Sequence, residues 1–187
     1  VDMLYEECGD VDDSLGIAPM LYRPRGGVEE KLKAGVENGG TLIDTYHAGL
    51  VNENDLCYRG GWPGAGLGEV FGLWHEDTDS LWDDEHNTLR LADGREYGLK
   101  DICALIHPRG AQVLGTYGDD FYQGEAALTV NQYGKGRAYY IASFGEDGLY
   151  RDLYQKLAGE LSLKRALEDL PPEGVEACLR ENGEAQY

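Results

Sequence analysis

The sequence predicts an α/β fold with a mainly parallel sheet and extra antiparallel strands, on three observations. First, the apolar run 15–22 has the length and composition of a strand that is buried on both faces, as parallel strands are. Second, an amphipathic helix and another apolar strand follow it with short joints, and this βαβ order requires a parallel pair. Third, the second half of the chain contains a series of antiparallel or mixed strands separated by tight turns.

The predicted helix of the βαβ unit covers residues 28–38. Val28, Leu32 and Val36 recur at helical spacing, and acidic residues in the first turn suit the helix dipole. Gly39 and Gly40 end the helix, and the apolar strand 41–46 begins directly after them. A long loop with many glycine and aromatic residues continues to Gly64, at the carboxyl end of that strand, where α/β proteins usually place function.

The remaining elements follow from turns and alternation. Before residue 75, we expect a short strand at 1–5, an acidic loop at 6–14 and a short helix or turn at 66–73. An acidic loop at 75–87 follows. The next element is a hairpin with its turn at 92–95, in which Leu89 and Leu91 belong to the first strand and Tyr97 to the second. Strands are expected at 111–117, 125–133 and 137–144, with turns at 118–124 and 134–136 between them.

A helix is predicted from Gly148 to about Leu161, with Asp147 as its N-cap. Its leucines at every fourth position form one apolar stripe, typical of a helix that packs on a core. Helical pattern continues over 163–170, and Pro171 and Pro172 end it. The Asn-Gly pair at 182–183 then predicts a hairpin within 175–187. We therefore expect one domain over 1–168, then a linker and the first hairpin of a truncated β-domain over 169–187.

Composition excludes some partners. Hydrophobic residues make up 42% of the chain and charged residues 27%, as in ordinary globular proteins. The 16 basic residues face 35 acidic ones, which gives a net charge of −19, and no basic run is present. Nucleic acid and anionic membranes both select basic surfaces, so we expect neither as a partner.

The four cysteines are far apart in sequence and form no C-x-x-C pair. This pattern favours neither a zinc site nor a disulfide scaffold, and it predicts reduced thiols in a cytoplasmic protein. No apolar run has the length of a membrane span. No cofactor or metal motif is present, because the acidic cluster around Asp79 lacks the spacing of a calcium loop. The first residues already resemble a strand and no initiator methionine precedes them, so we expect a piece of a longer protein.

The long loop also contains the residues from which a catalytic hypothesis can be built. His47 follows the buried strand, and Glu53 and Cys57 lie further along the loop. No elbow motif surrounds the thiol, and nothing nearby completes a triad. We therefore favour a structural role for the loop. The alternative hypothesis is a hydrolase or ligand-binding module that uses these three side chains.

Several segments, taken together in order, resemble the middle domain of the β-galactosidases of glycoside hydrolase family 42. The resemblance covers about residues 1–165 and rests on residues 18–22, 39–46, 49–55, 60–64, 111–114, 120–124 and 133–141. It implies a flavodoxin-like, three-layer sandwich similar to class I glutamine amidotransferases but without their catalytic residues. It also implies that the family's first strand and helix are missing before Val1.

The same resemblance implies a function. In the family this domain is a trimerisation domain, and catalysis belongs to a (β/α)₈ barrel that precedes it. Such a barrel needs about 250 residues, more than this chain has. We therefore expect a non-catalytic oligomerisation domain of a bacterial enzyme that hydrolyses terminal β-D-galactosides with retention, with a homotrimer and the enzyme's own barrel as partners.

Candidate interface or structural residues all lie in or near the long loop. Tyr and Trp are enriched at interfaces, whereas the polar loop residues suit backbone contacts. Asn52 departs from the family, which often has Asp at that position. The candidates are His47, Asn52, Glu53, Asp55, Tyr58, Trp62 and Trp74.

Overall fold

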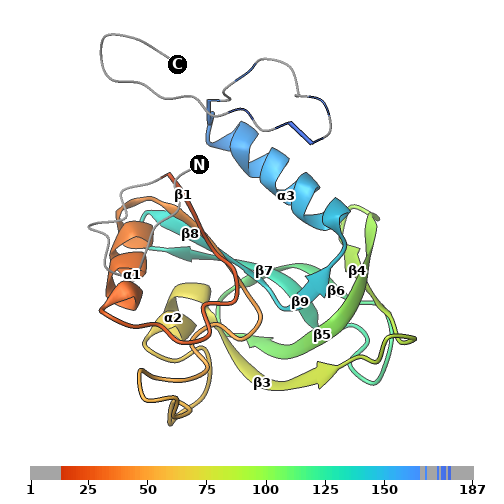
Figure 1. Ribbon diagram of the computed structural model, residues 1–187, viewed down its shortest axis with the longest axis horizontal. Helices are drawn as coiled ribbons and strands as arrows, with labels where there is room; N and C mark the ends of the chain where they lie inside the picture. Colours follow the sequence, from red (N-terminus) through yellow and green to blue (C-terminus); the bar gives the residue numbers. More distant parts are fainter. Residues whose placement is uncertain (1–13, 165–166, 168–171, 173, 176, 178–187) are drawn as a thin grey trace.

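The computed structural model of the protein describes residues 14–164 and, beyond them, 167, 172, 174, 175 and 177. Within that part, strands and helices alternate only near the start (Figure 1). The elements in chain order are β1 (Leu15–Ala18), α1 (Val28–Asn38), β2 (Thr41–Thr45), α2 (Leu67–Phe71), β3 (Leu73–Ser80), β4 (Asn87–Leu91), β5 (Glu96–Pro108), β6 (Gln112–Tyr117), β7 (Ala126–Tyr133), β8 (Gly136–Ile141), β9 (Ser143–Gly145) and α3 (Asp147–Glu160).

All nine strands belong to one sheet. Its order is β1-β2-β8-β7-β6-β4-β5-β3, and β9 pairs with β5 beside this path. β1 and β2 are parallel, and so are β2 and β8. Every other pair in the described part is antiparallel. The predicted βαβ unit of β1, α1 and β2 is confirmed.

The prediction of a flavodoxin-like sandwich with a mainly parallel sheet is wrong. Only β1, β2 and β8 run parallel, and one helix alone connects successive parallel strands. From β3 to β8 no helix connects the strands, and three pairs of consecutive strands, β4–β5, β6–β7 and β7–β8, are antiparallel hairpins. Two of their turns contain a glycine with positive φ, Gly94 with φ 88° and Gly134 with φ 56°. Left-handed turns of this kind place consecutive strands side by side and antiparallel. The result is a β-rich, mixed sheet with few helices.

The antiparallel part curls into a ring. β4 pairs with β5 and β6, β6 pairs with β7, and β7 returns to β5 through Ala126 and Ile106. The long strand β5 makes this closure possible, because its two halves serve different neighbours: β4 along the first half, β3 along the second. Figure 1 shows the strong curvature of β3, β4 and β5 in this half of the sheet.

Helices cover two faces of the sheet. Phe71 of α2 contacts the ring of Tyr140 of β8 edge-to-face at 5.2 Å, and α1 packs beside α2. Three residues earlier on β8, Arg137 forms an ion pair at 2.9 Å with Glu160 of α3. Residues an odd number apart on a strand point to opposite faces, so α3 lies across the sheet from α1 and α2.

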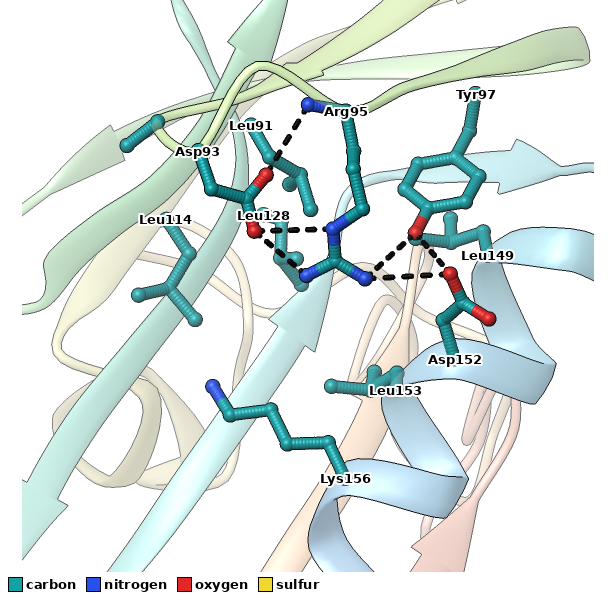
Figure 2. A pocket seen from close by; sticks show the side chains of 11 residues that line it. Leu91, Asp93, Arg95, Tyr97, Leu114, Leu128, Leu149, Asp152, Leu153 and Lys156 are labelled. Carbon is teal, nitrogen blue, oxygen red and sulfur yellow. Dashed lines mark hydrogen bonds and ion pairs between the residues drawn. The ribbon is translucent and has the colours of Figure 1, made fainter.

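The apolar stripe of α3 packs as predicted. Leu149, Leu153 and Leu157 are buried, and beside them a pocket of about 190 Å³ separates the helix from the β4–β5 hairpin (Figure 2). Asp147 is the first helical residue and not the N-cap, which is Glu146, without a side-chain capping bond. That part of the prediction is wrong, because the chain enters α3 directly from β9 with Glu146 in extended conformation.

One strand, β3, and most of another, β5, were not expected. Residues 75–87 were predicted to be an acidic loop, but β3 covers the first part of this segment. β5 extends to Pro108, although only its start was predicted. The expected strand at 15–22 ends at Ala18, and Met20 turns with φ 52°. The predicted strand at 1–5, most of the loop at 6–14, the helical pattern over 163–170 and the hairpin at 175–187 lie largely or wholly outside the described residues, and the domain division stays a prediction.

Candidate interface loop and groove

The long loop after β2 is folded back on itself and onto the start of β3. Gly64 N–H donates to the carbonyl of Gly49 at 2.9 Å, which joins the two ends of the loop. A backbone bridge pairs Trp62 with His75 of β3, and His75 N–H donates to the Trp62 carbonyl at 2.7 Å. The loop therefore shields the first part of an edge strand whose polar groups would otherwise be unpaired.

His47 lies at the inner end of this loop, with φ 64°. Its ring is half-buried and stacks on the ring of His75, with centroids 6.4 Å apart and planes 13° apart. Burial lowers the pKa of both histidines. The Nε2 atom of His75 lies 2.7 Å from the Asp77 carbonyl, so we assign the proton to Nε2 of the neutral ring. This pair is a packing contact at the base of the loop.

Asn52, Glu53 and Asp55 lie on the outer turn. The Asn52 side-chain oxygen accepts from the backbone N–H groups of Asn54 and Leu56 at 2.9 and 3.1 Å. Asp55, with φ 59°, forms an exposed ion pair with Arg23 at 2.9 Å. Glu53 is exposed. Asn52 and Asp55 thus fix the shape of the turn, as side chains of this kind do in Asx-type loops.

Tyr58 and Cys57 lie on the return arm. A Cβ atom at Gly64 would lie 2.1 Å from the Tyr58 ring, so the ring packs directly on that glycine backbone. Cys57 is an exposed free thiol. Within residues 14–164 no hydrogen bond links this thiol to His47, whose ring neighbours are Tyr46 and His75. The geometry does not assemble the thiol and imidazole that the catalytic alternative needs.

Trp62 and Trp74 line one groove of about 440 Å³. This groove, called the β3 groove below, lies between α2 and the start of β3. Trp74 stacks on His107 of the neighbouring strand at 4.6 Å, and the Arg109 guanidinium lies 5.5 Å from the Trp74 ring. Trp62 contacts His75 edge-to-face at 5.5 Å. Two tryptophans and an arginine in one groove match the composition of interface hot spots.

Sequence reasoning did not identify Arg109 and Asn131, which complete the groove. Asn131 donates to the Val70 carbonyl at 2.9 Å and so fixes the end of α2. Arg109 follows β5, whose second half was not expected. His107 of β5 pairs with Trp74 of β3, and Arg109 comes two residues after His107. The position of Arg109 beside Trp74 therefore could not be predicted without knowing that β5 continues to this point.

The described residues hold no group of three or more His, Cys, Asp or Glu side chains arranged for a metal ion. Among them, no helix combines the length and apolar character that crossing a bilayer needs. The recognisable features of this region are thus a fixed loop shape and a groove rich in aromatic residues.

Comparison with known proteins assigns this chain to a protein family. The family model described as the β-galactosidase trimerisation domain matches residues 12–164. The chain belongs to this family. Its relatives include β-galactosidase Pbg of Clostridium perfringens, 45% identical over 96% of the chain, and β-galactosidase BglY of Alicyclobacillus acidocaldarius, 42% identical over all of it.

The solved structures agree with the assignment. The trimerisation domain superposes on the β-galactosidase of Rahnella sp. R3 with a TM-score of 0.93 and 44% identity, over 99% of this chain. That superposition uses 28% of the Rahnella chain, and the matches to the Clostridium and Alicyclobacillus proteins use 27% and 28% of theirs. The expected resemblance to this family is confirmed, and the chain spans little more than a quarter of the length of the proteins it matches.

Proposed function

We propose that this trimerisation domain serves as a non-catalytic assembly unit of a longer β-galactosidase and that three copies associate through it. The match of residues 12–164 to the trimerisation family carries this proposal. The relatives named β-galactosidase support an enzyme that hydrolyses terminal β-D-galactosides with retention, through carboxylates outside this chain. Its own catalytic barrel is the second proposed partner, and the cytoplasm is the proposed compartment.

The candidate interface residues fit this role in different ways. Trp62 and Trp74 present aromatic surface at the β3 groove, as interface anchors do. Asn52 and Asp55 act through the shape of the loop, which holds the groove wall in place before association and so reduces the entropy lost on binding.

Two measurements test the proposal. Light scattering of the full-length protein gives its mass, and we expect three times the mass of one chain. Turnover of a chromogenic β-galactoside is expected from the full-length protein and not from the purified 187-residue chain. A monomeric or dimeric full-length protein contradicts the trimer, and turnover by the short chain that a point mutation within it abolishes contradicts the non-catalytic role.

A further inference from the structure

The edge strand β3 carries two different surfaces at its two ends. The β3 groove lies at its start, next to Leu73 and Trp74. Beyond its end, at Ser80, two loops expose large aromatic rings: Trp82 is 76% exposed and Phe121 is 79% exposed. Eight residues of strand separate the two surfaces by roughly 25 Å. Figure 1 shows β3 running from the region below α2 to the opposite side of the molecule, where these loops lie.

Trp82 and Phe121 are called the aromatic prong below, and contacts within their loops fix the Phe121 ring and the backbone at Trp82. Phe121 packs edge-to-face on Tyr122 at 4.8 Å, and the Tyr122 hydroxyl donates to Asp79 of β3 at 2.8 Å. The backbone N–H of Trp82 donates to Glu85 at 2.9 Å. Exposed aromatic rings on loops that are already ordered lose little conformational entropy when a partner covers them.

The prong and the groove differ in charge. Acidic residues lie next to both rings of the prong in the sequence: Asp83, Asp84 and Glu85 follow Trp82, and Asp119 and Asp120 precede Phe121. Of these five, Asp119 is 4.0 Å from Arg90, which partly offsets its charge. In the groove, Glu69 is 3.4 Å from Lys33, which offsets its charge. Arg109 has no carboxylate within ion-pair distance in the described part of the chain, and its guanidinium lies over Trp74. In a chain of net charge −19, the groove thus offers a cation where most of the surface offers anions.

We propose that the aromatic prong of one copy docks into the β3 groove of the next copy. A ring of three copies requires a heterologous interface, in which two different patches of the same chain meet. The two ends of β3 supply such patches, with aromatic rings on both and opposite charge between the prong acids and Arg109. Contact between two prongs would place acids against acids, which disfavours a symmetric dimer through this surface. The inference rests on the proposed trimer and names its contact.

Complementary variants of the full-length protein test this contact. Arg109→Glu damages the groove and leaves the prong intact, whereas the double variant Trp82→Ser/Phe121→Ser damages the prong and leaves the groove intact. All three side chains are exposed, so circular dichroism and the melting temperature of the monomeric unit are expected to stay near the wild-type values. Ile17→Ser is the matched control, because Ile17 is an exposed apolar residue (45%) on β1, the opposite edge of the sheet.

Each damaged variant alone is expected to lose the trimer, with an apparent dissociation constant raised at least about tenfold. An equimolar mixture retains one intact prong–groove contact per pair, so it is expected to form a complex of twice the single-chain mass and no larger ring. The control variant is expected to remain trimeric.

The outcomes separate this inference from the proposed function. A wild-type protein that is monomeric overturns the trimer itself. A trimeric wild type whose two damaged variants also remain trimeric overturns the prong–groove contact and leaves the proposed function standing. If both variants dissociate but their mixture stays monomeric, the two surfaces do not meet each other, and the inference is wrong.

Discussion

His47 and His75 stack almost parallel, with ring centroids 6.4 Å apart, at the point where the long loop meets the edge strand. Burial is the main cause that lowers the pKa of each, and for His75 the proximity of His47 lowers it further. With the proton assigned to Nε2, beside the Asp77 carbonyl, Nδ1 of His75 is buried without a hydrogen-bond partner in the described part of the chain. A second proton at Nδ1 would therefore gain no acceptor.

The first prediction concerns acidification. Because the folded pKa of His75 lies below its unfolded value, the unfolded chain binds more protons, and the free energy of unfolding falls as the pH drops from 7 to 5. We expect His75 to contribute to this loss of stability. His75→Gln, which is neutral throughout, should reduce the loss. Urea denaturation at each pH measures the free energy of unfolding of the variant and of the wild type.

His86 supplies the control for this prediction. It is exposed, and His86→Gln makes the same change of residue type outside the stacked pair. An identical loss on acidification in the His75→Gln variant and the wild type would show that protonation of His75 is not coupled to unfolding.

The second prediction concerns Gly72, which lies in the wall of the β3 groove with φ 61°. A Cβ atom there would lie 2.5 Å from Cγ of Asn131, the side chain that holds the carbonyl of Val70. Gly72→Ala should therefore lower the free energy of unfolding in two ways. The clash with Asn131 costs about 1–3 kcal/mol, and the positive φ of a residue with a Cβ atom costs about 1–2 kcal/mol. Chemical denaturation of the purified chain measures the sum.

Gly94→Ala is the matched substitution. Gly94 also has a positive φ, 88°, but a Cβ atom there meets nothing within 4 Å. The Gly94→Ala variant should therefore lose only the stability that the positive φ costs, about 1–2 kcal/mol. Equal destabilisation by the two substitutions would mean that Asn131 moves aside freely and that the groove wall is not fixed by this contact.

The third prediction compares polar and apolar contacts of α3. Arg95 of the β4–β5 hairpin binds Asp93 at 2.7 Å and Asp152 of α3 at 3.2 Å, as Figure 2 shows. These groups are about half exposed, so Arg95→Ala should destabilise the fold only slightly. Leu153→Ala removes a buried side chain from the same contact and should cost about 2–5 kcal/mol.

Salt provides a further readout for this pair of variants. Added NaCl should shrink the effect of Arg95→Ala, because it screens exposed charges, and leave that of Leu153→Ala nearly unchanged. Lys156→Ala, an exposed change on the same helix, should have little effect on stability. If Arg95→Ala destabilises as much as Leu153→Ala, the polar contacts and not the leucines hold α3 in place.

The sequence predicted those elements whose signals are local. The stripe of Val28, Leu32 and Val36, the glycines after it and the buried strand β2 all depend on neighbours in sequence, and the structure confirms them. β3 was missed because it is an edge strand, whose solvent-facing positions carry acids instead of apolar residues.

The long strand β5 was missed for a different reason. Its alternation of buried and exposed residues is interrupted after Leu99, where Asp101 adopts φ 62° and the pairing with β9 shifts register. Cys103 and Ala104 are both buried, and beyond them the alternation continues in the other phase. A period-2 pattern cannot be followed through such a shift. The mainly parallel sheet was inferred from one βαβ unit and from the family resemblance. The expected strands β6, β7 and β8 pair antiparallel within the same sheet, and the unexpected strand β3 adds another antiparallel pair, so the sheet is mixed.

The candidate site was predicted in part. Trp62 and Trp74 were selected as interface aromatics, and the structure brings both into the β3 groove, although their role in assembly stays a prediction. Arg109 reaches the groove only through the pairing of β5 with β3. No pattern within a single segment of the sequence contains that long-range contact.

The last prediction concerns Asp44 of β2, which is fully buried beside its register partner Tyr140. Its Oδ1 accepts from the N–H of Thr45 at 2.7 Å, whereas Oδ2 has no partner among the described residues. Burial raises the pKa of this carboxyl well above its ordinary value. The folded chain therefore holds a proton that the unfolded chain releases above about pH 4, so the stability that Asp44 contributes falls as the pH rises.

Asp44→Asn keeps the Oδ1 acceptor and cannot ionise, so the variant should be more stable than the wild type at pH 8, by on the order of 1–3 kcal/mol. The difference should shrink toward pH 4, opposite in direction to the effect of the histidines. Asp44→Leu, which also removes the acceptor for Thr45, should be less stable than Asp44→Asn at every pH, by about 1–3 kcal/mol. Denaturation of the three proteins from pH 4 to 8 measures these differences. A constant gap between the wild type and Asp44→Asn would mean that the folded and the unfolded chain bind the same number of protons at Asp44, so that burial does not raise the pKa of this carboxyl, and the inference about Asp44 would fail.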